Sequence, residues 1–251
     1  MEFNIWEGVY TSFEEVPRIG HGFNQNRWVE AVLQKTLSVK EDHENISSTI
    51  PQFPSYSKSL LPLLTAVVKT KYEKMRILDF GGGLGIDYLR TINSQTNSET
   101  YYYHIVENEI LCDHGNRLFD QDRNIVYHLS ILTDCKFDII YSSSSVQYVE
   151  DWKGIITQFS SVSTQYLLLT DLPAGDIPTF ATAQNYYGSK IPSWFFNISE
   201  FIEYTASQGF ALQFCSTYKG NILGKYDYLP QDNFPEYYRL GRSCNLLFTK
   251  S

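Results

Sequence analysis

The chain has 251 residues, which is enough for one large domain with a full hydrophobic core, or for one domain with an appended segment. Hydrophobic residues make up 43% of the sequence and charged residues 19%, which excludes a wholly disordered protein. The 20 Lys and Arg against 28 Asp and Glu give a net charge of −8. Such an acidic balance disfavours a protein that binds nucleic acid.

The spacing of the cysteines and the hydropathy of the chain exclude further classes of protein. No two cysteines have the spacing of a zinc site or of a disulfide framework, so neither is expected. The first ten residues carry an acid where a signal peptide would carry Lys or Arg. The best apolar run, 60–68, is interrupted by Pro62 and Thr65 and is too short to cross a bilayer. We therefore expect a protein of a reducing compartment, the cytoplasm, without a membrane span. The cysteines are Cys112, Cys135, Cys215 and Cys244.

The first 74 residues have a different pattern from the rest. Apolar residues in 27–40 have helical spacing, which predicts a helix there. The apolar stretch 57–72 predicts a second helix. Between them, 42–54 is polar and ends in prolines, as a linker does. We predict a helical N-terminal extension over 1–74, placed to act as a lid, and a second unit over 75–251.

From Met75 onward, short apolar runs alternate with stretches of helical periodicity, which predicts βαβ units around a parallel sheet. The expected strands are 76–80, 101–107, 124–129, 137–141 and 165–170. The expected helices are 84–93, 109–119 and 151–162. Residues 171–196 read as irregular. A helix over 199–208 follows, with Asn197 as its cap and Glu200 at the capping-box position, and then strands over 210–217 and 243–249.

The run ILDFGGGLG, residues 77–85, lies where a strand must turn into a helix. Glycines there let the backbone approach a ligand that a Cβ would exclude, and the start of the helix offers free N–H groups. The next strand ends in Glu107, 22 residues after Gly85 (107 − 85). Ligands of open α/β sheets bind outside the carboxyl ends of the strands, where a carboxylate can accept both hydroxyls of a ribose. The two features together predict a cofactor that contains a nucleoside.

The glycine spacing discriminates between cofactors. A dinucleotide fingerprint fails, because its third glycine would fall on Ile86 or Tyr88, and there is no Gly-Lys-Ser/Thr of a Walker A loop. The pattern that remains, Asp-x-Gly-x-Gly-x-Gly, resembles the first motif of class I S-adenosylmethionine-dependent methyltransferases. The resemblance implies an α/β fold with a doubly wound, mostly parallel, seven-stranded Rossmann-like sheet. A tight strand–helix turn without a ligand is the alternative reading.

The same resemblance implies S-adenosylmethionine as cofactor and gives roles to individual residues. Asp79 and the glycine loop would hold its amino-acid end, and Glu107 its ribose. Adenine contacts would follow the third strand, where Ser130 and Asp134 are both candidates, and the loop after 137–141 would run beside the cofactor. The candidate cofactor-binding residues are Asp79, Gly81, Gly82, Gly83, Gly85, Glu107, Asn108, Ser130, Ser142 and Ser143.

Motifs outside this core carry a second resemblance. They recur in the same order in a bacterial group of methyltransferases that is often associated with surface-polysaccharide loci, and the likeness covers nearly the whole chain. The chain departs from that group at His21-Gly22-Phe23, where Gly-Tyr-Asp-like residues are expected. The motifs are 6–10, 20–23, 146–148, 171–173, 182–185, 191–192 and 196–197.

Methyl transfer to a hydroxyl requires a proton acceptor, because a protonated alcohol is a poor nucleophile. Asp171 ends the fifth strand beside the predicted cleft and is the first catalytic candidate, with capping before Pro173 as its alternative. His21 lies in the predicted N-terminal cover, and histidine is a common general base, with a structural role as its alternative. The candidate acceptor-binding residues are Gln147, Tyr148, Gln184 and Tyr187.

We therefore expect methyl transfer from S-adenosylmethionine to a small-molecule acceptor, such as a hydroxyl of a sugar or sugar nucleotide, without a metal and without nucleic acid as partner. Two other functions stay open at this point: a module that binds the cofactor without catalysis, and a nicotinamide-dependent oxidoreductase. The acceptor, the methylated atom and the oligomeric state are also open.

Overall fold

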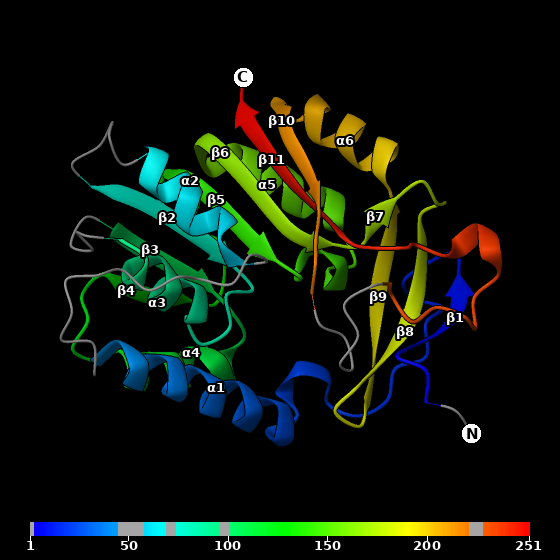
Figure 1. Cartoon of the computed structure of the whole chain (residues 1–251), viewed down its shortest axis with the longest axis horizontal. Coiled ribbons are helices and arrows are strands. Elements are labelled where there is room, and N and C mark those ends of the chain that lie inside the picture. Colours follow the sequence, from blue (N-terminus) through cyan, green and yellow to red (C-terminus); the bar gives the residue numbers. More distant parts are fainter. Residues whose placement is uncertain (1–2, 45–57, 69–73, 96–100, 221–227) are drawn as a thin grey trace.

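The computed structural model describes residues 3–44, 58–68, 74–95, 101–220 and 228–251 (Figure 1). Within these residues, seven strands form one sheet in the order β10-β11-β6-β5-β2-β3-β4. The neighbours from β6 to β4 run parallel, and β11 lies antiparallel between β6 and β10. This confirms the predicted fold class, an α/β Rossmann-like sheet that is mostly parallel. The strands are β2 (Met75–Phe80), β3 (Tyr101–Val106), β4 (Ile125–His128), β5 (Phe137–Ser143), β6 (Ser163–Leu172), β10 (Phe210–Thr217) and β11 (Cys244–Lys250).

Helices cover both faces of this sheet, which explains why its central strands are apolar at consecutive positions. Side chains alternate between the two faces of a strand, so Ile77 packs with the helices of one face and its neighbour Leu78 with those of the other. The first face carries α3 (Ile86–Asn93) and α4 (Glu109–Leu118), and the second carries α5 (Trp152–Val162) and α6 (Ile198–Ser207). The predicted strands and helices of 75–170 therefore lie close to where periodicity placed them.

The N-terminal segment is not helical throughout. It contains α1 (Asn26–Glu44) and α2 (Leu60–Val68), as predicted, but also a 3-10 turn at Gly22–Asn24 and the strand β1 (Trp6–Tyr10), which pairs antiparallel with β8 (Phe180–Tyr186). Most of the predicted linker, 45–54, lies outside the described residues. The division of the chain at residue 74 stays a prediction.

The prediction that 171–196 is irregular was wrong. These residues form β7 (Ala174–Gly175), β8 and β9 (Ser189–Asn197), which join β1 in a four-stranded sheet of order β1-β8-β9-β7. The hairpin between β8 and β9 turns at Tyr187 and Gly188, which both have positive φ, 48° and 84°. Both faces of this hairpin are buried, since Phe180 and Ala181 pack into different clusters. The alternation that would mark a half-exposed strand is therefore missing from the sequence.

The cap of α6 lies where the sequence predicts it. The Asn197 side chain accepts a hydrogen bond from the backbone N–H of Glu200 (2.9 Å) and donates one to the carbonyl of Ile177 (2.9 Å). The Glu200 carboxylate does not complete a capping box, because it accepts instead from the Thr179 hydroxyl (2.6 Å).

We expect Asn197→Ala to lower the free energy of unfolding by about 1–2 kcal/mol, because both partners of the amide lose a hydrogen bond. Urea denaturation measures the difference. Ser199→Ala, at an exposed position of the same helix, serves as control and should change stability by less than about 0.5 kcal/mol. Equal effects of the two substitutions would contradict the capping role.

Candidate cofactor and acceptor site

The glycine loop connects β2 to α3, and its glycines are required for different reasons. Gly81, Gly83 and Gly85 all have positive φ, between 58° and 79°. A Cβ on Gly81 would lie 2.3 Å from the Ser145 hydroxyl. A Cβ on Gly83 would meet nothing closer than Val32, at 3.9 Å, and would project into open space. The chain therefore passes close to the loop after β5 at Gly81 and leaves room for another molecule at Gly83.

Asp79 lies beneath this loop. Its side chain is 1% exposed, and its carboxylate accepts a hydrogen bond from the Tyr103 hydroxyl (2.7 Å). A Cβ on Gly82 would lie 2.6 Å from this carboxylate, so the loop rests directly on it. Burial raises the pKa of Asp79 well above its usual range, and the nearby Asp87 carboxylate raises it further. Asp79 therefore supports the loop from below and does not line the space above it.

Glu107 follows β3 and reaches across to the glycine loop. One carboxylate oxygen accepts from the backbone N–H of Gly83 (3.1 Å), and the other accepts from the backbone N–H of Asn108 (2.9 Å). Burial raises the pKa of Glu107, and these two N–H groups oppose the rise. Asn108 in turn caps α4 by accepting from the backbone N–H of Leu111 (3.1 Å). The carboxylate is thus fixed at the carboxyl edge of the sheet, next to the open space at Gly83.

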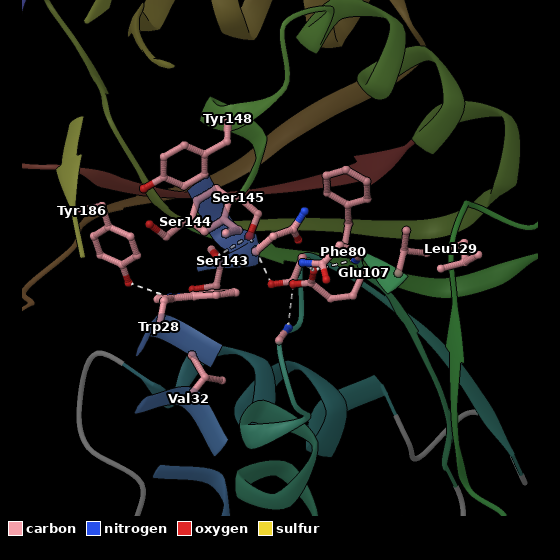
Figure 2. Close-up of a pocket in the computed structure, with 16 residues that line it drawn as sticks. Trp28, Val32, Phe80, Glu107, Leu129, Ser143, Ser144, Ser145, Tyr148 and Tyr186 are labelled. Carbon is pink, nitrogen blue, oxygen red and sulfur yellow. Dashed lines mark hydrogen bonds between the residues drawn. The ribbon is translucent and has the colours of Figure 1, made fainter. Parts of the chain in front are cut away.

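A cavity of about 650 Å³ opens at this edge, within the size range of small-molecule sites. It is bounded by the glycine loop, by the ends of β3 and β5, and by the start of α1. Figure 2 shows Leu129, Phe80 and Glu107 toward one end and Trp28, Tyr148 and Tyr186 toward the other. The lining residues are Phe23, Asn24, Trp28, Val32, Phe80, Gly81, Gly83, Val106, Glu107, Asn108, Leu129, Ser143, Ser144, Ser145, Tyr148 and Tyr186.

Four aromatic side chains, Phe23, Trp28, Tyr148 and Tyr186, form what we call the aromatic wall of the cavity. The centre of the Phe23 ring lies 4.8 Å from that of Tyr148 and 5.1 Å from that of Trp28. Trp28 donates its indole N–H to the Tyr186 hydroxyl (3.1 Å), and the Tyr148 hydroxyl donates to Gln184 (2.8 Å). Burial raises the pKa of both phenols, so they stay neutral at ordinary pH.

Strained backbone lies at the ends of β5 and β6. Ser144 and Asp171 both have a φ of 53°, a left-handed conformation that costs a non-glycine residue about 1–3 kcal/mol and is concentrated at functional sites. The backbone N–H of Ser144 donates to the carbonyl of Thr170 (2.9 Å), and that of Asp171 donates to the Asn245 side chain (3.2 Å). Ser144 lines the cavity, whereas Asp171 lies behind it.

The Asp171 carboxyl should make stability depend on pH. Burial raises its pKa to about 6, against the opposing effects of the Lys58 ammonium and of the Ser243 and Ser144 hydroxyls. A folded-state pKa above the unfolded value of about 3.9 means that this proton stabilises the folded state at low pH, and that the contribution is lost as the pH rises through about 6.

We therefore expect the free energy of unfolding of the wild type to fall by up to about 3 kcal/mol between about pH 4 and pH 7, because one pKa unit corresponds to about 1.4 kcal/mol. The Asp171→Asn variant lacks this titrating group and should not show this fall. Urea denaturation of both proteins across this range measures the difference. If the difference in unfolding free energy between the wild type and Asp171→Asn does not change with pH, the raised pKa of Asp171 is contradicted.

The structure gathers only part of the predicted site around the cavity. The predicted residues that line it are Gly81, Gly83, Glu107, Asn108, Ser143 and Tyr148. Others lie beneath or behind that lining, namely Asp79, Gly82, Gly85, Ser142, Gln147, Gln184 and Asp171. Ser142 donates to the carbonyl of Phe80 (3.0 Å), and Gln147 donates to the Ser144 hydroxyl (2.9 Å), so both act on the lining residues. His21, Ser130 and Tyr187 are exposed and do not line the cavity, and neither does Asp134.

The sequence predicts the N-terminal segment as a lid, but it does not identify which residues of α1 and of the turn before it line the cavity. Phe23, Trp28 and Val32 line the cavity, because α1 packs over the start of α3 and against α4 through Trp28, Val29, Leu84 and Leu111. The helical period of 27–40 indicates a buried face but not what that face covers.

The described residues offer neither a membrane-spanning helix nor a metal site. They contain no helix that is both long and apolar enough to cross a membrane. They also contain no group of three or more His, Cys, Asp or Glu side chains placed to hold a metal ion.

Comparison with known proteins gave matches of structure and not of sequence. No family model matches the chain, and no curated protein matches it. Among solved structures, the 1,6-didemethyltoxoflavin N1-methyltransferase of Burkholderia thailandensis, with 1,6-didemethyltoxoflavin and S-adenosylhomocysteine bound, superposes with a TM-score of 0.53 at 11% identity, over 94% of each chain. The chain has the class I methyltransferase fold.

Two other solved structures share this methyltransferase fold. An S-adenosylmethionine-dependent methyltransferase of Clostridium acetobutylicum gives a TM-score of 0.52 at 10% identity, over 87% of this chain and 99% of that one. The CcbJ methyltransferase of Streptomyces caelestis gives 0.52 at 11% identity, over 85% and 96%. At such low sequence identity, the likeness to these structures shows a shared fold and nothing further.

Proposed function

We propose that the chain transfers a methyl group from S-adenosylmethionine to a small-molecule acceptor. The observation that carries the proposal is the Glu107 carboxylate, which is held against the backbone N–H of Gly83 (3.1 Å) at the rim of a cavity that widens where Gly83 lacks a Cβ. A half-buried carboxylate at the end of the second parallel strand suits the two hydroxyls of a ribose. The methyltransferase fold of the chain supports the same assignment.

The residues present fit this cofactor. Val106 and Leu129 offer apolar surface for the adenine, Glu107 would hold the ribose, and Gly83 leaves room for the chain that follows it. When bound, S-adenosylmethionine supplies a methyl group already activated on a sulfonium. The work of the protein is then to align the acceptor and to exclude water. The aromatic wall serves both purposes at the far end of the cavity.

For the acceptor, we propose a hydroxyl of a sugar or sugar nucleotide. The flat, amphipathic rings of Trp28, Tyr148 and Tyr186 can stack against the apolar face of a sugar and still hydrogen-bond its edge. Ser144 lies between the cavity and Asp171, so a proton released by the hydroxyl would pass through the serine to the carboxylate. The likeness to the polysaccharide-associated group agrees with this acceptor and stays a prediction.

Calorimetric titration with S-adenosylhomocysteine and with NADH tests the cofactor. We expect micromolar binding of the first and none of the second; the reverse result would favour the nicotinamide oxidoreductase. Incubation with methyl-labelled S-adenosylmethionine and a panel of sugar nucleotides then tests the reaction. Binding of the cofactor without a labelled product from any member of a broad panel would favour the non-catalytic module.

A further inference from the structure

The described lining of the cavity contains an anionic side chain but no cationic one. Among the described residues that line it, Glu107 is negatively charged and none is Lys, Arg or His. The amino-acid end of S-adenosylmethionine carries both an ammonium and a carboxylate. Removing that carboxylate from water without a partner of opposite charge would cost several kcal/mol on general grounds. A cation just behind the lining would supply such a partner.

Lys58, two residues before the start of α2, has the geometry for this role. Its ammonium donates a hydrogen bond to the Ser143 hydroxyl (3.3 Å), and Ser143 lines the cavity. Ser143 lies in the middle of the lining, between the aromatic wall and Glu107 (Figure 2). The Lys58 ammonium also lies 5.7 Å from the centre of the Tyr218 ring.

The surroundings of Lys58 keep it charged but leave it able to bind an anion. Burial would lower the pKa of the ammonium, but the Asp87 and Asp171 carboxylates and the Tyr218 phenol outweigh burial and raise it. Asp87 is already engaged, by an ion pair with Arg90 (2.7 Å) and by a hydrogen bond from the Tyr141 hydroxyl (2.9 Å). Within the described part of the chain, no carboxylate forms an ion pair with Lys58 itself.

We propose that Lys58 binds the carboxylate of the amino-acid end of S-adenosylmethionine, with the Ser143 hydroxyl beside it. The proposal rests on the proposed function, because it names a residue for the same cofactor. It assigns a binding role to a position in the N-terminal segment that belongs to none of the motifs. It also separates two sources of affinity: Glu107 for the nucleoside and Lys58 for the amino acid.

Three ligands separate these contributions in calorimetric titrations of the full chain. S-Adenosylhomocysteine has both charged groups, decarboxylated S-adenosylhomocysteine lacks only the carboxylate, and 5′-methylthioadenosine lacks the whole amino-acid end. The wild type should bind S-adenosylhomocysteine at least about tenfold more tightly than the decarboxylated compound, as expected for a buried hydrogen bond to a charged group. Lys58→Met should abolish this preference and bind 5′-methylthioadenosine like the wild type.

The controls are Lys58→Arg, which should keep most of the preference, and Lys219→Met, an exposed lysine that should behave like the wild type. Equal affinity of the wild type for the two homocysteine ligands would overturn the proposal, as would a preference that survives in Lys58→Met or an equal loss of all three ligands. Should Lys58→Met not fold, a tenfold preference in the wild type that Lys58→Arg retains supports the proposal. Failure of the wild type to bind any of the three ligands would instead refute the proposed function.

Discussion

Glu107→Ala should weaken the binding of S-adenosylhomocysteine by about 1–3 kcal/mol, the value typical of hydrogen bonds to a charged group. The carboxylate has two expected roles. It would accept the ribose hydroxyls, and it holds the backbone N–H groups of Gly83 and Asn108 in place. The substitution therefore removes a ligand contact and loosens the loop that shapes the cavity. Calorimetric titration measures the change in affinity.

Two variants separate these roles of Glu107. Glu107→Gln keeps one oxygen acceptor and should lose less affinity than Glu107→Ala. Glu109→Ala, two residues further on and exposed in the first turn of α4, removes the same charge without facing the cavity and should bind like the wild type. If Glu107→Ala and Glu109→Ala bind equally well, the nucleoside does not lie at Glu107.

Gly83→Val should weaken binding of the same ligand by about 2–3 kcal/mol, roughly a hundredfold, because its side chain fills space that the ligand needs. The Cβ of any residue at this position projects toward the cavity, with Val32 as its nearest neighbour at 3.9 Å. A φ of 58° also strains a β-branched residue, so the variant should be less stable by about 1–2 kcal/mol.

Gly188→Val provides the matched control for this strain. Gly188 also has a positive φ, 84°, and open space around its Cβ position, but it lies at the tip of the β8–β9 hairpin. The two valine variants should therefore lose similar stability in urea denaturation, whereas only Gly83→Val should lose affinity. Unimpaired binding by Gly83→Val would mean that the cavity at the glycine loop is not where the ligand lies.

Local patterns predict the sheet of this protein well, because its strands and helices differ in apolar period and are separated by glycine or polar turns. The strand–glycine–helix segment from Met75 to Asn93 is an example, and so is the cap at Asn197. The β8–β9 hairpin is not predicted, because both of its faces are buried and its sequence therefore lacks the alternation of apolar and polar residues that marks a half-exposed strand. Pro192, which suggests an irregular chain, lies within β9 opposite Ala183.

The candidate site, like the fold, has a part that the sequence predicts and a part that it does not. Glu107 and Gly83 are predictable because both follow from the order of strand, loop and next strand. The aromatic wall is not, because Trp28 and Tyr186 are 158 positions apart and meet only through the packing of α1 and the hairpin. Lys58 is not predictable either, since a lysine before an apolar helix is usually solvated and nothing local indicates that it lies behind Ser143.

The pairing of β1 with β8 has a consequence for how the protein forms. Trp6 aligns with Gln184, so these partners are separated by 178 positions (184 − 6) along the chain. During translation, β1 emerges long before the strand that it must join, and closing so long a loop is entropically costly and slow. The parallel core from β2 to β6 can assemble from nearer neighbours. The aromatic wall of the cavity, which depends on the β8–β9 hairpin through Tyr186, should therefore be among the last parts of the molecule to become ordered.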